Sequence, residues 1–451
     1  MKALSLLSLL VLLIAPPSRA DNATDRVRGH EPRMSYLDNG KIRFGVDLNA
    51  GGAITYLSRS GSDENLVNSF DFGRQIQMSY YSGPVPFAAD GKLPKPEWKL
   101  IGWNPIQVGD AFGNPSKVLE TSNDGKQIYV KCIPMHWPLD NVPGECTFQC
   151  WFELEANAVH ARCRMVNHRP DHAQYPARRQ ELPAIYTNGP WYRLMTYFGD
   201  QPFTHGQLTR IVKDKAERGP WSSWLATENW AALVDDHDFG LGIYIPGVVE
   251  FGGGFAGKPR AGGPHDSPTG YIAPHPNEII DWNIEHEYRY DLVLGTLSQI
   301  RQYVYAHAKP AVPPSYQFGK DRQGWTYIHA SDAGWPISGQ LDVSLDQDDP
   351  QLIGPVGLWK AEDAGTLVIE AASRTSRTDA KVFWRGISDA RFSKEKAADF
   401  ALNNDGAWHT YRVRLSENPA WTGAIVQLRL DPMVSGTPTD WIRIKSISLA
   451  K

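Results

Sequence analysis

The chain has 451 residues, a formal net charge of −4 and 21% charged residues, with acids and bases nearly balanced. This length predicts two or three domains, and the even charge gives no indication of binding to nucleic acid or to an anionic membrane surface. The 40 Gly, 33 Pro, 16 Trp and 18 Tyr residues indicate a turn-rich, all-β protein.

Residues 1–20 have the pattern of a cleaved export signal. Lys2 precedes an apolar run, and Ser18-Arg-Ala20 fits the small-x-small pattern before a cleavage site. The apolar run is too short to span a bilayer, and no later segment is long and apolar enough to do so. We therefore expect a secreted or periplasmic chain that begins near Asp21, without membrane insertion.

Between residues 33 and 311 the dominant pattern is the strand alternation of apolar and polar residues, broken by turn formers. Clear examples cover residues 41–48, 146–154, 160–167, 230–234, 239–244 and 287–294. Residues 298–306 predict a short helix with Ser298 as its cap. Glycine and proline crowd residues 251–276, which we interpret as a long loop.

A second run of short strands follows the proline-rich connector at residues 310–314. Its members cover residues 339–345, 365–372, 380–386, 408–416, 423–430 and 441–449. Such a run predicts a β-sandwich. We therefore predict a signal peptide over residues 1–20, a catalytic domain over residues 21–312 and a β-sandwich domain over residues 320–451.

Residues 65–115 combine aromatic, amide and turn-forming side chains more densely than a core strand or a solvated loop requires. Rings cover the C–H face of a sugar, and amide and guanidinium groups bond its hydroxyls. The stretch indicates either a wall for a hydroxyl-rich ligand or an edge strand with well-anchored loops. The candidate ligand-binding residues are Arg74, Gln77, Tyr80, Trp103 and Asn104, with Trp230 at the start of a later strand.

Four cysteines in an exported chain favour disulfides. Two alternating runs joined by a two-residue turn place Cys150 directly opposite Cys163. We predict a Cys150–Cys163 bridge and a Cys132–Cys146 bridge that closes the proline-rich loop between them. The alternative is four free buried thiols, whereas a zinc site would need tighter pairs.

Part of the chain resembles the galactose-mutarotase-like proteins. The resemblance lies in segments that begin at Asn39, Gly51, Asn65 and Asp71, and in a closing strand and helix over residues 287–303. It implies an antiparallel β-supersandwich, two large sheets curved around a sugar cleft. The Asn-His-x-Tyr/Phe-Phe-Asn-type segment of mutarotases is missing, which puts simple aldose mutarotation in doubt. Polysaccharide lyases and glycoside hydrolases also contain supersandwich domains.

A second resemblance covers about 50 residues near the C-terminus. Residues 405–415, 421–432 and 442–449 look like the closing strands of galactose-binding-like sandwich modules. These modules often accompany secreted polysaccharide-degrading enzymes. The resemblance implies a smaller, jelly-roll-like β-sandwich and names no ligand. We interpret Trp408 and Trp421 as core anchors.

Sugar cleavage needs a proton donor and a base or nucleophile. Glycosidases use two carboxylates, whereas lyases use Tyr, His or Lys with a group that stabilises the developing charge. Our catalytic candidates are Glu181, which follows two arginines, Glu228 at a strand mouth, and His205 and Tyr197 in a polar cluster. For each, the alternative is a structural role as a salt-bridged, hydrogen-bonded or packed residue.

These features predict an exported carbohydrate-active enzyme that cleaves the glycosidic bonds of a polysaccharide or oligosaccharide. A glycoside hydrolase ranks first because Glu181 and Glu228 offer a carboxylate pair. The alternatives are a polysaccharide lyase acting by β-elimination on a uronate polymer, an aldose-epimerase-like enzyme and a non-catalytic glycan-binding protein. No cofactor is expected. Several His, Asp and Glu residues between positions 265 and 286 leave a divalent metal open, without diagnostic spacing.

Overall fold

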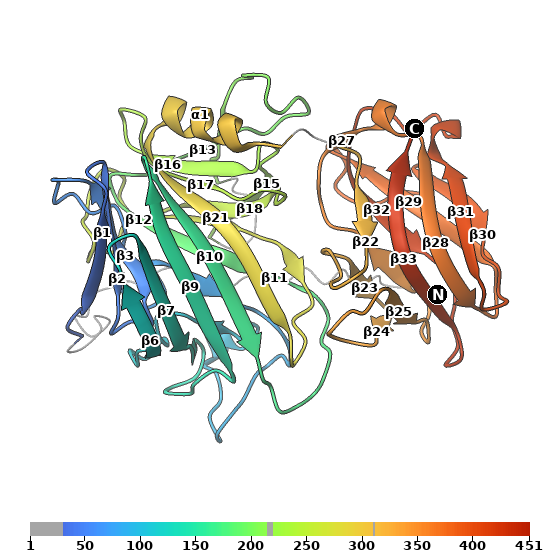
Figure 1. Cartoon of the computed structure of the whole chain (residues 1–451), viewed down its shortest axis with the longest axis horizontal. Coiled ribbons are helices and arrows are strands. Elements are labelled where there is room, and N and C mark those ends of the chain that lie inside the picture. Colours follow the sequence, from blue (N-terminus) through green and yellow to red (C-terminus); the bar gives the residue numbers. More distant parts are fainter. Residues whose placement is uncertain (1–29, 214–219, 310–311) are drawn as a thin grey trace.

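The computed structural model describes residues 30–213, 220–309 and 312–451, so the expected export signal lies outside the described residues. Two β-sandwiches lie side by side, one built from strands β1–β21 and one from β22–β33 (Figure 1). Every strand pair in them is antiparallel, which confirms the prediction of an all-β protein. Within the described residues, no helix is long and apolar enough to cross a membrane.

The first sandwich consists of two large sheets packed face to face, with a small ribbon at one end. The ten-stranded sheet contains β1 (Met34–Asp38), β2 (Ile42–Asp47), β3 (Ala53–Arg59), β4 (Ile76–Ser79), β12 (Glu181–Asn188), β19 (Thr269–Pro274), β18 (Glu250–Ala256) and β15 (Ser222–Leu225) in spatial order, and β5 (Pro105–Ile106) and β8 (Met135–His136) at the side of β4. The nine-stranded sheet contains β14 (Thr209–Arg210), β13 (Arg193–Thr196), β16 (Trp230–Val234), β17 (Phe239–Tyr244), β21 (Glu285–Thr296), β10 (Ala158–Asn167), β9 (Cys146–Glu155), β7 (Gln127–Ile133) and β6 (Lys117–Asn123). The ribbon pairs β11 (Arg178–Arg179) with β20 (Asn277–Glu278).

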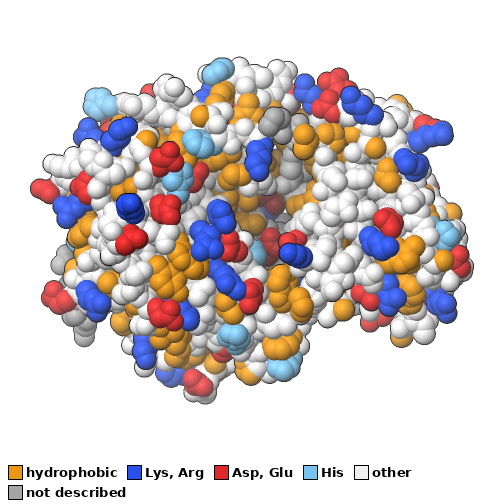
Figure 2. All heavy atoms as spheres, viewed as in Figure 1, with side chains coloured by type: hydrophobic (Ala, Val, Ile, Leu, Met, Phe, Trp, Pro, Cys, Tyr) orange, Lys and Arg blue, Asp and Glu red, His pale blue; other side chains and the backbone are white. Residues whose placement is uncertain are grey.

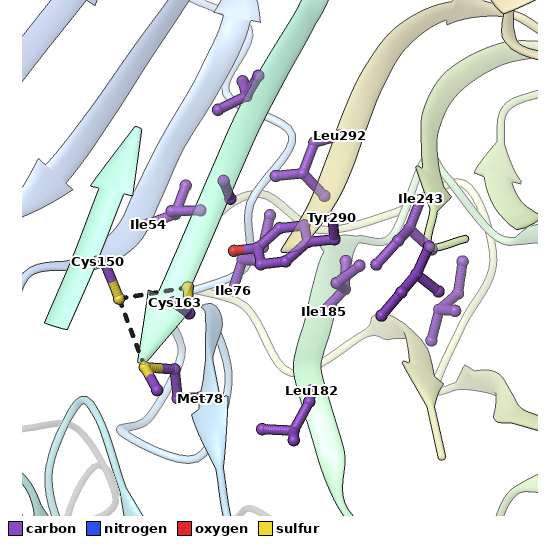
Figure 3. Packing of buried hydrophobic residues seen from close by; sticks show 14 of the residues in the cluster. Ile54, Ile76, Met78, Cys150, Cys163, Leu182, Ile185, Ile243, Tyr290 and Leu292 are labelled. Carbon is purple, nitrogen blue, oxygen red and sulfur yellow. Dashed lines mark hydrogen bonds between the residues drawn. The ribbon is translucent and has the colours of Figure 1, made fainter. Parts of the chain in front are cut away.

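The main core fills the space between these two sheets, and Figure 3 shows part of it around the cysteines. The predicted register is confirmed, since Cys150 of β9 pairs with Cys163 of β10. The predicted bridges are not present: all four cysteines are free and buried, and the sulfur atoms of Cys150 and Cys163 are 3.5 Å apart. A disulfide needs about 2.05 Å, so these thiols pack as small apolar groups, with Cys150 also touching Met78.

The stretch predicted as a long loop over residues 251–276 contains two strands, β18 and β19. β18 carries three consecutive glycines, Gly252–Gly254, that pair along β19. Glycine weakens a strand but allows other groups to approach its backbone closely. The prediction of a loop was wrong because the glycines have no side chains of their own to mark a strand. Side chains from neighbouring strands fill the space above them.

Helix α1 (Leu297–His307) confirms the predicted helix but not its cap. The Thr296 side chain, not that of Ser298, accepts a hydrogen bond from the Gln299 backbone N–H, and the Gln299 side chain accepts one from the Thr296 backbone N–H. This capping box fixes the start of the helix. Ile300 and Val304 then pack on the outer side of the nine-stranded sheet.

The second sandwich has two six-stranded sheets around its own core. One contains β24 (Ser331–Asp332), β25 (Leu341–Ser344), β33 (Trp441–Ala450), β28 (Thr366–Arg374), β31 (Trp408–Arg414) and β22 (Ser315–Gln317). The other contains β23 (Thr326–Ile328), β26 (Gln351–Ile353), β32 (Ala424–Asp431), β29 (Asp379–Gly386), β30 (Ala397–Ala401) and β27 (Trp359–Lys360). Trp421 is a buried core residue as interpreted, whereas Trp408 is partly exposed.

The two sandwiches share a buried polar junction. Arg322 of the second sandwich contacts Asp281 of the first at 2.5 Å and Asp332 at 2.6 Å, and all three side chains are almost fully buried. Gln174 donates to both carboxylates. Ile279 also enters the core of the second sandwich, so the interface is apolar as well as ionic.

Replacing Thr296 by alanine should lower the free energy of unfolding by about 1 kcal/mol, because the start of α1 loses its cap. The matched control is Ser298→Ala at the exposed position first predicted as the cap, which should change stability by less than about 0.5 kcal/mol. Chemical denaturation of the full chain measures both. Equal effects of the two substitutions would contradict the assigned cap.

The thiols provide a second test. Because burial raises the pKa of Cys132 to about 12 and those of Cys146 and Cys150 well above their usual value, the folded protein should not react with a thiol reagent at neutral pH. Unfolding without reductant should then release all four thiols. Fewer than four would show that a bridge forms after all.

Candidate active site

The outer face of the ten-stranded sheet carries a cluster of aromatic and polar side chains that is separate from the main core. Alternate residues of β12 and β19 point to this face: Ala184, Tyr186, Tyr271 and Ala273 pack together there with Trp221. Most outer faces of antiparallel sheets are solvated and polar. A buried aromatic cluster in this position is therefore a candidate site.

Three rings form a ladder across neighbouring strands. The Tyr186 and Tyr271 rings lie 4.8 Å apart, and the Trp221 and Tyr271 rings 4.9 Å apart. Gly254 pairs with Tyr271, and a Cβ atom at Gly254 would approach the Trp221 ring to 3.2 Å. The glycine therefore makes room for the indole, and the ladder offers flat apolar surfaces of the kind that cover sugar rings.

Glu181 begins β12, where a register shift interrupts its pairing with β4. Its side chain is buried, and its Oε1 atom has no regular hydrogen bond within the described part of the chain. Burial raises the pKa of this carboxyl group, and the nearby hydroxyls of Tyr271, Tyr81 and Ser79 only partly oppose the rise. Glu181 is therefore held toward its protonated form, in which it can donate a proton.

His275 follows β19 and lies over Gly252 of β18, where a Cβ atom would come within 2.2 Å of the ring. Burial, helped by the charge of Arg179, lowers the pKa of His275 to about 3. The imidazole is therefore neutral at ordinary pH, and its buried Nε2 atom has no partner among the described residues. It can donate to or accept from a ligand hydroxyl according to its tautomer.

Asp71 and Arg74 belong to the loop before β4. Arg74 lies 3.3 Å from Asp71 and donates to the Ser267 carbonyl at 2.6 Å. Burial, with the charges of Glu181 and Asp71, raises the pKa of Tyr186 well above its usual value. Two carboxylates from distant parts of the chain thus lie near one tyrosine of the ladder.

Several buried polar atoms on this face have no regular hydrogen bond within the described residues. They are Glu181 Oε1, the Tyr271 hydroxyl, His275 Nε2 and Trp221 Nε1. Buried polar groups in native proteins usually have partners, and an unpaired one costs about 1–3 kcal/mol. Glu181 and the Tyr271 hydroxyl are nevertheless close enough to interact with each other, so His275 Nε2 and Trp221 Nε1 are the two atoms here that most lack a partner. In Figure 2 the molecule is hollowed between the two sandwiches, with charged side chains of both signs along the hollow.

Glu228, the second predicted carboxylate, is not part of this face. It is fully buried and accepts hydrogen bonds from the Phe203 backbone, Trp230 Nε1, Arg301 Nη2 and the Tyr305 hydroxyl. Such a paired and saturated carboxylate anchors α1 and the loop around Phe203. The structure therefore corrects the predicted Glu181–Glu228 pair, and Trp230 serves this anchor rather than a ligand.

Tyr197 and His205 lie in the same anchored region. Tyr197 donates to the Gln201 carbonyl, and His205 packs its ring on Tyr305 with a positive φ of 61°. Beside them is a cavity of about 650 Å³ lined by residues of the loop 200–204, the end of α1, Val312 and residues 358–360 and 363 of the second sandwich. None of the residues around Glu181 lines this cavity.

Four of the predicted ligand-binding residues are structural. Tyr80 and Trp103 belong to the main core, with hydrogen bonds to His286 and Glu145. Buried Gln77 and Asn104 donate to backbone carbonyls. These four side chains are buried and already paired, so they cannot reach a ligand; the fifth, Arg74, remains at the candidate site.

Sequence reasoning missed Tyr186, Tyr271 and Trp221, and it considered His275 only as a possible metal ligand. The signal was present as Tyr271-x-Ala273-x-His275, an alternation that places three side chains on one face. The surrounding glycines and prolines hid it. Within the described residues, no three His, Cys, Asp or Glu side chains are grouped so as to hold a metal ion.

Comparison with solved structures gives galactose-mutarotase-like proteins. A candidate aldose 1-epimerase from Escherichia coli K12 is 10% identical, with a TM-score of 0.37, and the match covers 59% of this chain and 100% of that one. A galactose mutarotase related enzyme from Lactobacillus acidophilus is 11% identical, with a TM-score of 0.37, over 58% and 97% of the two chains. A low-affinity xylan-binding module from Roseburia intestinalis is 10% identical, with a TM-score of 0.23, over 31% and 95%.

No protein-family model matches the chain, and no curated protein is similar to it in sequence. The solved structures include members of the superfamily that the sequence resembles. At these identities and scores the activity has to be argued from the residues of this chain.

The ribbon beside the site carries a titratable group that links stability to pH. Burial raises the pKa of Glu278 to about 7, whereas an unfolded glutamate titrates near 4.3. Between these values the folded chain binds more protons, so stability falls as pH rises. Glu278→Gln should therefore raise the free energy of unfolding by about 3 kcal/mol at pH 8 and by only about 1 kcal/mol at pH 5.

Chemical denaturation at both pH values measures this difference, with Glu362→Gln on the surface as the control. A gain of equal size at pH 5 and pH 8 would contradict titration of Glu278.

Proposed function

We propose that the protein is a carbohydrate-active enzyme that hydrolyses glycosidic bonds on the outer face of the ten-stranded sheet, with Glu181 as the general acid. The observation that carries this proposal is the buried Glu181 carboxyl group, whose pKa is raised and whose Oε1 atom has no regular hydrogen bond. A carboxyl group whose pKa is raised by burial next to apolar rings is suited to protonating a glycosidic oxygen.

The ring ladder supports a sugar as the ligand. Tyr186, Tyr271 and Trp221 present stacked or tilted rings over neighbouring strands. His275 Nε2 and Trp221 Nε1 add buried polar atoms without a partner among the described residues. Apolar surface with a few fixed polar groups is the usual composition of a small-ligand site.

Asp71 is our candidate for the second carboxylate, in place of Glu228. In the proposed step the Glu181 proton moves to the glycosidic oxygen as its bond to the anomeric carbon breaks. Water attacks that carbon and gives its proton to Asp71. Arg74 holds Asp71 in position through their 3.3 Å contact.

Lyase chemistry is the second candidate because tyrosines and arginines also border the site. In that reaction a tyrosine or histidine would remove a proton beside a uronic carboxylate. Burial raises the pKa values of Tyr81 and Tyr271 well above their usual value, which disfavours the tyrosinate base. His275, whose pKa is lowered to about 3, is also a weak base, which places this alternative second.

Glu181→Gln should lower the rate of glycan cleavage by about 10²–10⁴-fold, because the amide keeps the shape of the side chain without its acidic proton. Activity is measured on a broad panel of polysaccharides, as new reducing ends and as the ultraviolet absorbance of unsaturated uronates. Reducing ends without absorbance indicate a hydrolase, and both signals together indicate a lyase.

Glu228→Gln is the matched control. It should lower stability, because it breaks the buried pair with Arg301, and leave the rate per folded molecule nearly unchanged. Wild-type activity in Glu181→Gln, or glycan binding without either cleavage signal, would overturn the proposed chemistry.

A further inference from the structure

Guanidinium groups from both sandwiches lie within electrostatic range of one another near the candidate site. Arg385 of β29 is close enough to Glu250 of β18 and to Arg179 of β11 for their charges to act on it. Arg179 forms a 3.2 Å contact with Glu250 and also acts on His275. The second sandwich therefore contributes a side chain to the border of a site built on the first.

Arg385 is held in place but keeps an unused donor. Its Nη2 atom donates to the Gln427 side chain and its Nη1 atom to the Asp389 carbonyl, while its buried Nε atom has no partner within the described residues. On the same sheet face Arg429 is bound through two nitrogens to Asp431. Arg385 has no such carboxylate, and burial lowers its pKa.

Arg178 shows the same imbalance more strongly. Its side chain is 7% exposed and donates to the carbonyls of Ser82, Leu100 and Ile101, yet the described residues place no carboxylate within ion-pair distance of it. Its Nε atom is also buried without a partner, and the group lies 5.8 Å from the centre of the Tyr81 ring. A buried charge without a counter-charge is unfavourable by several kcal/mol.

Only one carboxylate, Glu250, contacts any of these three guanidinium groups among the described residues. We infer that the site takes an acidic glycan, whose carboxylate or sulfate groups bind Arg385 and Arg179 and compensate the charge of Arg178. A planar guanidinium with free N–H donors is suited to such oxyanions. This inference rests on the proposed function, since it names the substrate class of the same site.

The test uses the full-length chain with Glu181→Gln, so that ligands are bound and not consumed. Binding is measured by calorimetry for uronate oligosaccharides and their methyl esters, for sulfated oligosaccharides and their desulfated forms, and for neutral oligosaccharides. We expect the acidic form of at least one pair to bind at least tenfold more tightly than its neutral form. The pair that shows the preference identifies carboxylate or sulfate as the recognised group.

Arg385→Ala should remove the preference for the acidic form and leave binding of the neutral form unchanged. Arg385→Lys should keep part of that preference, because lysine carries the charge but lacks the planar guanidinium with its paired N–H donors. Arg412→Ala, at an exposed position of β31 in the other sheet, should change neither. Circular dichroism of each variant verifies folding.

Equal binding of acidic and neutral forms, or an Arg385→Ala variant that keeps the preference, overturns the inference and leaves the proposed function intact. Absence of binding to every glycan, acidic and neutral, counts against both.

Discussion

The relative placement of the two sandwiches depends on the buried contact of Arg322 with Asp281 and Asp332. This contact joins the two sandwiches through charges that are almost fully removed from water. Removing one partner would leave an unpaired buried charge, which typically destabilises a protein by about 3–5 kcal/mol. The contact therefore favours one relative placement of the sandwiches, in which the charge of Glu250 acts on Arg385.

At the candidate site, burial is the main cause of the shifted pKa values. The same removal of water raises the pKa of Glu181 and lowers that of His275. A carboxyl group and an imidazole are thus both held toward their neutral forms within a few strands of each other. In these forms the carboxyl group can donate a proton, and the imidazole can donate or accept a hydrogen bond according to its tautomer.

Much of the fold was predictable from the sequence because strand alternation is a local signal. Residues 230–234 and 239–244 match β16 and β17 to the residue, and the pairing of Cys150 with Cys163 followed from turn length and alternation. The site was less predictable. Glu181 and Arg74 were identified from their neighbours, whereas Glu228 looked similar in sequence and proved to be an anchor.

The difference between these two glutamates is made by residues far away in the chain. Arg301 and Tyr305 donate hydrogen bonds to Glu228, and no pattern near Glu228 in the sequence predicts these partners. Conversely, Arg385 lies about 200 positions after Glu181 and reaches the site only because the second sandwich docks where it does. The composition of residues 65–115 suggested a ligand-binding wall, whereas the aromatic side chains of this stretch mostly belong to the core.

The glycines of β18 have a consequence for how this site can change over evolutionary time. The His275 and Trp221 rings occupy the places where side chains at Gly252 and Gly254 would stand. The width of the aromatic floor is therefore controlled by two positions that carry no side chain. A methyl group at position 252 would displace the His275 ring, and one at position 254 would push the Trp221 ring slightly aside, so these two positions constrain the shape of the site.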